Sequence, residues 1–126
     1  MAGKIDQAEA LARALVERER LREELLRWMK TMPLILTPVG AVPAFAHGAK
    51  RIVVGRDSFS VFRAFGYTQA FNVFGLPSVC VPAGQSAEGL PIGVQIVGQP
   101  NEENTILSAA AVIEEKLGGW RPPPQF

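Results

Sequence analysis

Few side chains in this sequence could carry out chemistry, and their spacing does not form a known catalytic motif. There is one histidine, His47, and one cysteine, Cys80. Ser86 comes closest to the nucleophile elbow G-x-S-x-G, in the run GQSAE at 84–88, but the second glycine is missing. A Ser-His-acid triad has little support, since no acidic residue lies near His47 in the sequence. The other serines stand at 58, 60, 78 and 108. These patterns assign no catalytic residue.

Metal and cofactor chemistry is equally poorly supported. His47 has no second ligand beside it, so we interpret it as a loop residue with a local hydrogen bond; contact with a ligand is the alternative. Cys80 lies between Val79 and Val81, which predicts an inert, buried thiol. The sequence has no metal-ligand spacing, no Walker-type loop and no dinucleotide fingerprint. We expect neither a metal site nor a cofactor.

Length and composition restrict the class of protein. The 126 residues suffice for one domain, and 48% hydrophobic content argues against disorder. A formal net charge of +1 implies no basic face, so nucleic-acid binding is not expected. No run is apolar enough to span a bilayer, and residues 1–30 do not resemble a signal peptide. With a single cysteine, these features indicate a cytoplasmic protein that does not bind membranes.

Residues 1–32 predict a long charged helix. Asp6 is a candidate N-cap with Glu9 three residues later, and no Gly or Pro follows before Pro33. Seven Lys or Arg and six Asp or Glu fall within residues 1–30, which indicates a solvated face more than a coiled coil. The pair Glu9 and Arg13 stands at helical spacing.

Residues 33–126 predict sheet and shorter helices. Residues 34–37 predict a strand, and residues 39–55 predict an irregular loop. Asp57 or Ser58 is the candidate N-cap of a second helix. A short helix over 69–74 should end at Gly75. Five phenylalanines at near-helical spacing favour core packing, with an apolar substrate pocket as the alternative. They are Phe59, Phe62, Phe65, Phe71 and Phe74.

The run from Tyr67 to Gly98 is nearly uncharged and organises the rest of the chain. Residues 77–81 and 91–98 predict a β-hairpin, with Pro82 ending the first strand and a polar connection over 83–90. Strands this apolar require cover on both faces, which is more protein than the run itself contains. A last helix should begin at a capping Asn101 and end at Gly118.

A series of short motifs resembles the C-terminal part of the amidase signature family. They are LTP at 36–38, FN at 71–72, GLP at 75–77, VP-x-G at 81–84 and GLPIGVQIVG at 89–98, followed by Glu103 and Trp120. The resemblance implies an α/β hydrolase that cleaves amide C–N bonds. It also implies a catalytic Ser-Ser-Lys set upstream of the matched region, so none of it maps onto this chain. Pro33, where relatives often have an acid, and Ala83, where many have Cys, are departures.

The resemblance defines our expectations. The fold class is α/β, a partial amidase-type fold whose mixed sheet has about three strands flanked by helices. Residues 1–126 form one C-terminal portion of an amidase domain, with the charged helix at 1–32 and the sheet and helix segment at 33–126. We expect no catalytic and no metal-binding residue in this chain. The substrate-binding residues are unknown, although Phe45 or Phe71 could line a pocket. The form of the motif at 71–75 favours free-standing amidases over the tRNA-dependent amidotransferase subunit.

Three functions remain open. The first is the C-terminal segment of an amidase, inactive alone. The second is a non-catalytic interaction module, or one half of a split amidase that docks a partner chain. An autonomous hydrolase with an unrecognised site ranks last. The partner is then the missing N-terminal amidase portion or a second copy, and an amide substrate is expected only in the complete enzyme.

Overall fold

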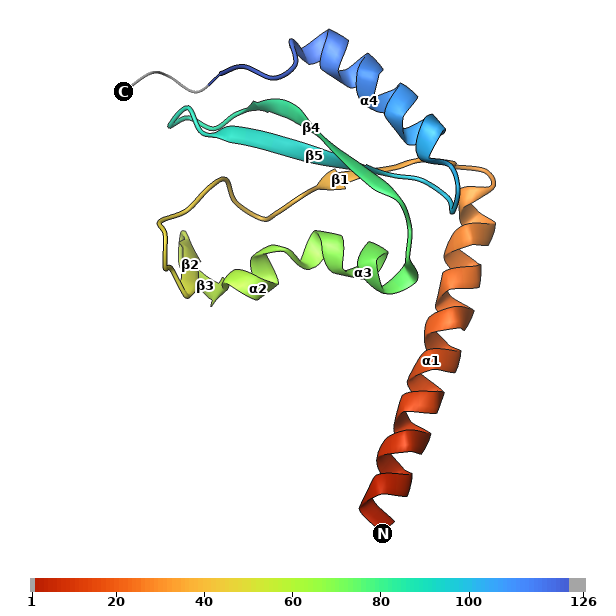
Figure 1. The fold of residues 1–126 in the computed structure, drawn as a ribbon. Coiled ribbons are helices and arrows are strands. Elements are labelled where there is room, and N and C mark those ends of the chain that lie inside the picture. Colours follow the sequence, from red (N-terminus) through yellow and green to blue (C-terminus); the bar gives the residue numbers. More distant parts are fainter. Residues whose placement is uncertain (1, 123–126) are drawn as a thin grey trace.

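The computed structural model describes residues 2–122, with side chains from Asp6 onward. Its helices and strands are interspersed along the chain (Figure 1). The helices are α1 (Ala2–Met29), α2 (Val61–Ala64), α3 (Gly66–Phe74) and α4 (Glu103–Leu117). The strands are β1 (Ile35–Pro38), β2 (Arg51–Val54), β3 (Asp57–Ser60), β4 (Ser78–Gln85) and β5 (Pro91–Val97). This is the α/β class that the sequence predicts.

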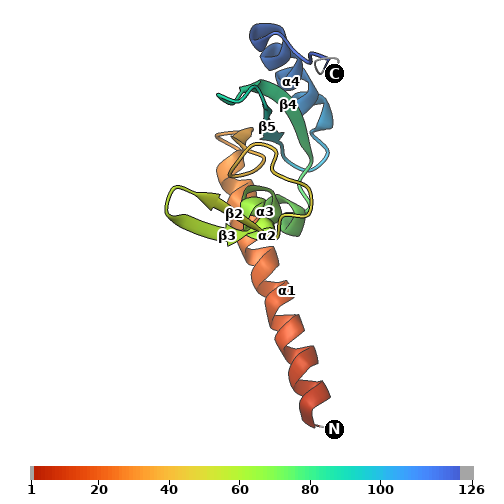
Figure 2. The same ribbon diagram turned by 90° about the vertical axis from the view of Figure 1, so that its left-hand side faces the viewer.

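The main sheet has three strands in the order β1-β5-β4, and a separate hairpin joins β2 to β3. Each pairing among the described strands is antiparallel. The helix α4 covers one face of the main sheet, and α2 and α3 lie across from the other face (Figures 1 and 2). The predicted hairpin of β4 and β5 is confirmed, with Val79 opposite Ile96 and Val81 opposite Val94.

Two small cores hold these layers together. The first joins β4 and β5 to α4 through Val81, Ile96, Ile106 and Ala110. The second joins the end of α1 to α3 and β5 through Met29, Leu76 and Val97, with Phe71 and Phe74 packed around them. Since neighbouring residues of β5 point to opposite faces, Ile96 and Val97 are covered on opposite sides of the sheet, as the apolar sequence of β5 requires.

The helix α1 projects well beyond the rest of the molecule (Figures 1 and 2). Near its inner end, the Nε of Arg22 donates to the carbonyl oxygen of Phe74 at 2.8 Å. Closer to the N-terminus, Leu11 is 61% exposed and Val16 is 71% exposed. The prediction that Asp6 caps this helix is wrong, because the helix begins at Ala2 and Asp6 lies inside it.

The region from 39 to 60 contains structure that the sequence analysis missed. Part of the predicted loop is strand β2, and Asp57 and Ser58 belong to β3 and do not cap a helix. The reason is the two-residue turn at Gly55, whose positive φ of 59° suits the first position of a type II′ hairpin. The helix cap moves to Ser60, whose hydroxyl accepts a hydrogen bond from the Arg63 amide at 3.2 Å.

Two further boundaries differ from prediction. The strand β4 continues through Pro82 to Gln85, because β4 is an edge strand, where a missing amide donor costs little, and a register shift follows at Pro82/Gly84. Glu102, not Asn101, is the N-cap of α4. The predicted ends of α3 at Gly75 and of α4 at Gly118 are confirmed, both in the left-handed conformation.

Candidate functional site

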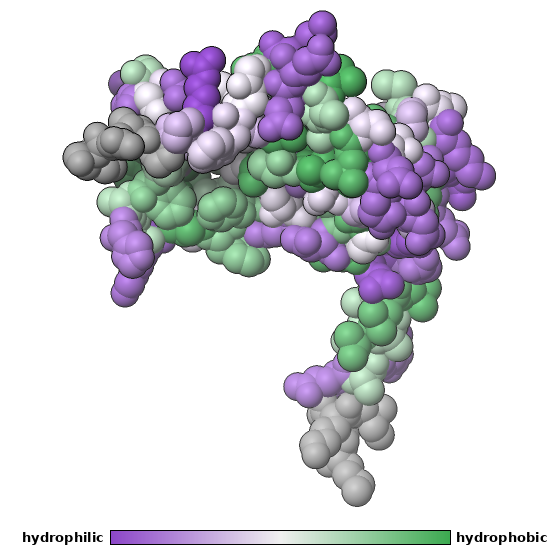
Figure 3. Space-filling view, turned by 45° about the horizontal axis from the view of Figure 1, so that its top comes forward, coloured by the Kyte–Doolittle hydropathy of each residue, from purple (hydrophilic) through white to green (hydrophobic). Residues whose placement is uncertain are grey.

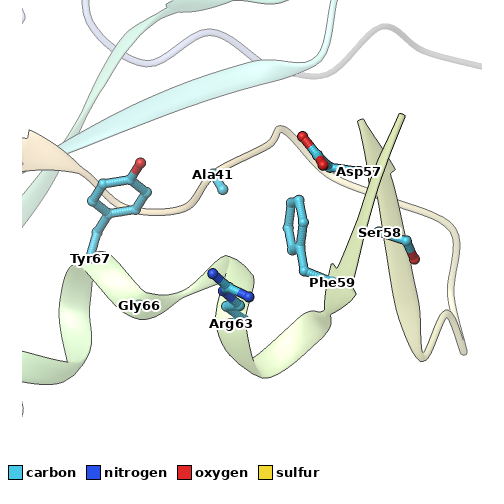
Figure 4. A pocket seen from close by; sticks show the side chains of 7 residues that line it. All are labelled: Ala41, Asp57, Ser58, Phe59, Arg63, Gly66 and Tyr67. Carbon is cyan, nitrogen blue, oxygen red and sulfur yellow. The ribbon is translucent and has the colours of Figure 1, made fainter. Parts of the chain in front are cut away.

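The larger of two described hollows is a pocket of about 720 Å³ between the β2–β3 hairpin and the α2–α3 helices. Its lining residues are Ala41, Asp57, Ser58, Phe59, Arg63, Gly66 and Tyr67. The guanidinium of Arg63 rises from α2 between the rings of Tyr67 and Phe59, and the Asp57 carboxylate lies at the upper edge (Figure 4). The side chain of Ser58 points away from the Arg63 guanidinium (Figure 4).

Backbone hydrogen bonds hold the walls of this pocket together. The Ala41 amide donates to the Ala64 carbonyl at 2.8 Å, which ties the β1–β2 loop to α2. The Val61 amide donates to the Lys50 carbonyl at 3.4 Å, which fixes the start of α2 beside the hairpin. These bonds connect α2 to the loop that precedes β2, so the pocket depends on how these elements fold against each other.

Gln95 connects the sheet to this region. It is buried at 5% exposure, and its Nε2 donates to Thr37 Oγ1 at 2.9 Å and to the Tyr67 carbonyl at 3.1 Å. The Pro38 carbonyl accepts from the same nitrogen at 3.3 Å. One side-chain amide therefore positions the end of β1 and the start of α3.

A second hollow of about 310 Å³ lies between the loop after β1 and the start of β5. It is lined mainly by residues 38–44 and 91–94, together with Phe65. The ring of Phe45 lies near that of Phe65, with 6.3 Å between centroids and a 54° interplanar angle. These residues are almost all apolar, so this hollow suits a hydrocarbon group.

The phenylalanine prediction is correct in part. Phe71 and Phe74 pack against the Met29 core as expected, so Phe71 does not line either hollow. Phe62 is 76% exposed and Phe65 is 41% exposed, so core packing is wrong for these two. Phe62 lies in the very short helix α2, which lacks the length to turn a full stripe inward, and Phe65 is the cap residue between α2 and α3.

The candidate nucleophiles identified from sequence do not come together. Four serine hydroxyls are engaged locally: Ser58 accepts from Arg51, Ser60 caps α2, Ser86 accepts from two amides of its own turn, and Ser108 donates to Asn104. These are turn and helix contacts of the ordinary structural kind.

His47 and Cys80 are also separate from the pocket. His47 is exposed in the β1–β2 loop. The prediction of a buried Cys80 is wrong: its thiol is exposed on the edge strand β4, on the face opposite Val79 and Val81. Partial desolvation raises the pKa of the Cys80 thiol, which keeps it protonated and unreactive at neutral pH.

Neither a metal centre nor a membrane span was found within residues 2–122. In that part of the chain, no three His, Cys, Asp or Glu side chains come together as metal ligands. None of the helices described there has the length and hydropathy needed to cross a bilayer.

Apolar side chains remain on the surface in unusual number. Figure 3 shows green apolar surface over the body of the molecule and again along the projecting α1 helix. Side chains at least half exposed include Leu11, Val16, Trp28, Leu36, Val73, Leu107 and Trp120. Contiguous apolar patches are typical of binding surfaces.

The chain belongs to the Amidase family, because the model of that family matches residues 1–107. The A subunit of glutamyl-tRNA(Gln) amidotransferase from Xanthobacter autotrophicus is 44% identical over 92 residues, which make up 73% of this chain and 18% of the relative. The corresponding protein of Nitrobacter hamburgensis is 42% identical over 88 residues, or 70% of this chain and 17% of the relative.

Solved structures agree with this assignment. An amidase matches with a TM-score of 0.75 at 31% identity, over 83% of this chain and 24% of its own. A 6-aminohexanoate cyclic dimer hydrolase matches with a TM-score of 0.74 at 28% identity, over 89% of this chain and 25% of its own. The chain therefore spans about a fifth to a quarter of the proteins it matches.

The two groups of relatives leave one prediction from the sequence untested. The motif at 71–75 favours free-standing amidases when it is taken alone. The sequence relatives above are amidotransferase A subunits at 42% to 44% identity, whereas the solved amidase is 31% identical. These identities cover the whole matched segment, so the preference drawn from the motif at 71–75 stays a prediction.

Proposed function

We propose that residues 1–126 supply the C-terminal part of the scaffold of an enzyme that hydrolyses amide C–N bonds, and that this segment does not hydrolyse amides by itself. The observation that carries the proposal is the family match over residues 1–107, in a chain that spans only 17% to 25% of its relatives. Most of the catalytic domain of such an enzyme lies outside a segment of this length.

The chemistry of the segment supports the proposal. Covalent amide hydrolysis needs a nucleophile and a base within hydrogen-bonding reach of each other. The serine hydroxyls at 58, 60, 86 and 108 bind their own turns or neighbours, Ser78 lies at the start of β4, and His47 is exposed on a different loop. What the segment offers is a sheet, its helical cover and two hollows.

The test is an amidase assay on the isolated chain. Purified residues 1–126 are incubated with small aliphatic and aromatic amides, and ammonia release is measured. We expect no release above the buffer rate. Turnover that copurifies with the chain and is lost on its thermal unfolding would refute the inactivity.

A second function, docking to another protein chain, is favoured by the exposed apolar surface. Leu36 is 59% exposed on β1, an edge strand of the sheet, and Leu11 and Val16 are exposed on the projecting helix. Edge strands and apolar faces of this kind favour association. The partner in this proposal is the remaining amidase portion or a second copy, in a cytoplasmic setting and without nucleic acid.

Light scattering after size-exclusion chromatography tests the docking proposal. We expect the isolated chain to elute as oligomers or to be poorly soluble, and Leu11→Glu with Val16→Glu to shift it toward monomer. A native chain that is monomeric and unfolds in one sharp cooperative transition at low concentration contradicts it.

A further inference from the structure

The pocket between the β2–β3 hairpin and α2–α3 carries charges that have no partner among the described residues. The guanidinium of Arg63 forms no hydrogen bond or ion pair with any of them, and neither does the carboxylate of Asp57. Arg20 pairs with two glutamates of α1 and Arg51 binds Ser58, whereas the side chains of Arg27 and Arg56, like that of Arg63, have no partner among the described residues. A free guanidinium that points into a hollow is available to a ligand.

The remaining lining complements these charges. Tyr67 lines the side of the hollow opposite Phe59 (Figure 4), and its hydroxyl, for which no hydrogen bond is found among the described residues, adds a neutral donor. The Phe59 ring and the Ala41 methyl group provide apolar surface between the basic and acidic sides (Figure 4). The hollow of about 720 Å³ is in the size range of small-molecule sites.

The combination selects one kind of ligand. A guanidinium binds a carboxylate through two parallel hydrogen bonds, and a tyrosine hydroxyl can add a third. Asp57 at the edge of the same hollow repels a second negative charge and attracts an ammonium group. Phosphates and dicarboxylates are therefore disfavoured, and a molecule with one carboxylate and one ammonium group across a short hydrocarbon chain is favoured.

We propose that this pocket binds a small amino acid zwitterion, with its carboxylate on Arg63 and Tyr67 and its ammonium group toward Asp57. The site is held in shape by Gln95, which fixes the backbone of Tyr67, and by the bond between Ala41 and Ala64. Binding does not require amide hydrolysis, so the proposal stands or falls separately from the proposed function.

The test is isothermal titration of the full chain of 126 residues with γ-aminobutyrate, n-butyrate and n-butylamine. We expect γ-aminobutyrate to bind more tightly than either singly charged compound. Arg63→Gln should weaken γ-aminobutyrate binding about tenfold or more, because it removes a charge-assisted pair. Asp57→Asn should reduce γ-aminobutyrate to the affinity of n-butyrate.

Two further variants serve as controls. Arg56→Gln removes a neighbouring charge in the hairpin turn, outside the lining, and should leave binding unchanged. Arg63→Lys retains the charge and should lose less affinity than Arg63→Gln, and circular dichroism reports whether each variant is folded. The proposal is overturned if γ-aminobutyrate does not bind, or if native chain, Arg63→Gln and Arg56→Gln bind it equally.

Discussion

Replacement of Gln95 by glutamate should destabilise the fold strongly and in a pH-dependent way. The Nε2 group of Gln95 faces three oxygen acceptors, Thr37 Oγ1 at 2.9 Å and the carbonyls of Tyr67 at 3.1 Å and Pro38 at 3.3 Å. Gln95→Glu replaces this donor with a negative oxygen in a side chain that is only 5% exposed. The substitution preserves shape, so the effect isolates hydrogen bonding and charge.

The expected loss of stability depends on which groups each variant leaves unpaired. Gln95→Met keeps the volume but leaves the acceptors without their donor, at a cost of about 1–3 kcal/mol. Gln95→Glu adds a buried, unpaired charge against carbonyl oxygens, and at neutral pH should cost about 2 kcal/mol more than the methionine variant.

The pH dependence of the stability distinguishes Gln95→Glu from Gln95→Met. Burial and the facing carbonyl oxygens raise the pKa of a glutamate at position 95 above its unfolded value of about 4.3. Because the folded state then binds the proton more tightly, the extra cost is absent below about pH 4 and grows as pH rises through the folded pKa. The methionine variant has no such slope relative to the native chain.

The assay is urea unfolding of the native chain and both variants across this pH range, followed by circular dichroism. Equal stability of Gln95→Glu and Gln95→Met at neutral pH would refute the reasoning. So would a glutamate variant whose stability relative to the native chain does not change with pH.

Three further predictions follow from single contacts. Gly98→Ala should destabilise by about 1–3 kcal/mol in urea unfolding, because the new Cβ would lie 2.6 Å from Ile106 Cγ2 and force α4 away from β5; an unchanged midpoint contradicts this. Met29→Ala should cost about 2–5 kcal/mol, since Met29 is fully buried, and a loss below about 1 kcal/mol would be too small for that burial. Ser86→Ala should raise the pKa of Glu88 in an NMR titration, because the Ser86 side chain holds that pKa below its usual range. In the native chain, the stabilisation that goes with this lowered pKa is present above the unfolded pKa and is lost as pH falls through the folded pKa. Identical Glu88 titration curves for the native chain and Ser86→Ala would disprove the contact.

Much of the fold could be predicted from sequence because it depends on local signals. The apolar runs at 78–81 and 91–97 and the glycines at 75 and 118 fix strands and helix ends within a few residues. The family could be recognised from the motif at 89–98. These features are set by backbone propensity and burial, which a single sequence displays.

The candidate site could not be predicted because its residues come together only through a hairpin that the sequence analysis missed. Ala41, Asp57, Arg63 and Tyr67 meet only when the β2–β3 hairpin folds against α2 and α3. The one local signal was Gly55 before a polar residue, between two short runs, which is typical of a tight hairpin. With that hairpin recognised, Asp57 becomes a strand residue and not a helix cap.

The exposure of the Cys80 thiol could not be predicted from the sequence either. Flanking valines indicate a strand but not which face is covered. Val79 and Val81 pack in the core with α4, so Cys80 points to the opposite face of the sheet, where it is exposed. Sequence alone does not show which face a helix will cover.

The central claim is that this segment is a working part of an amidase scaffold, and a chimera tests it most directly. In the solved amidase that is 31% identical, the matching segment is replaced by residues 1–126 of this chain, and kcat/KM is measured on that amidase's own amide substrate. A chimera with Gln95→Glu serves as the matched control. We expect the chimera to retain measurable amide hydrolysis and the control to lose most of it. A chimera that folds, as judged by circular dichroism, but has no hydrolysis above background would contradict the account.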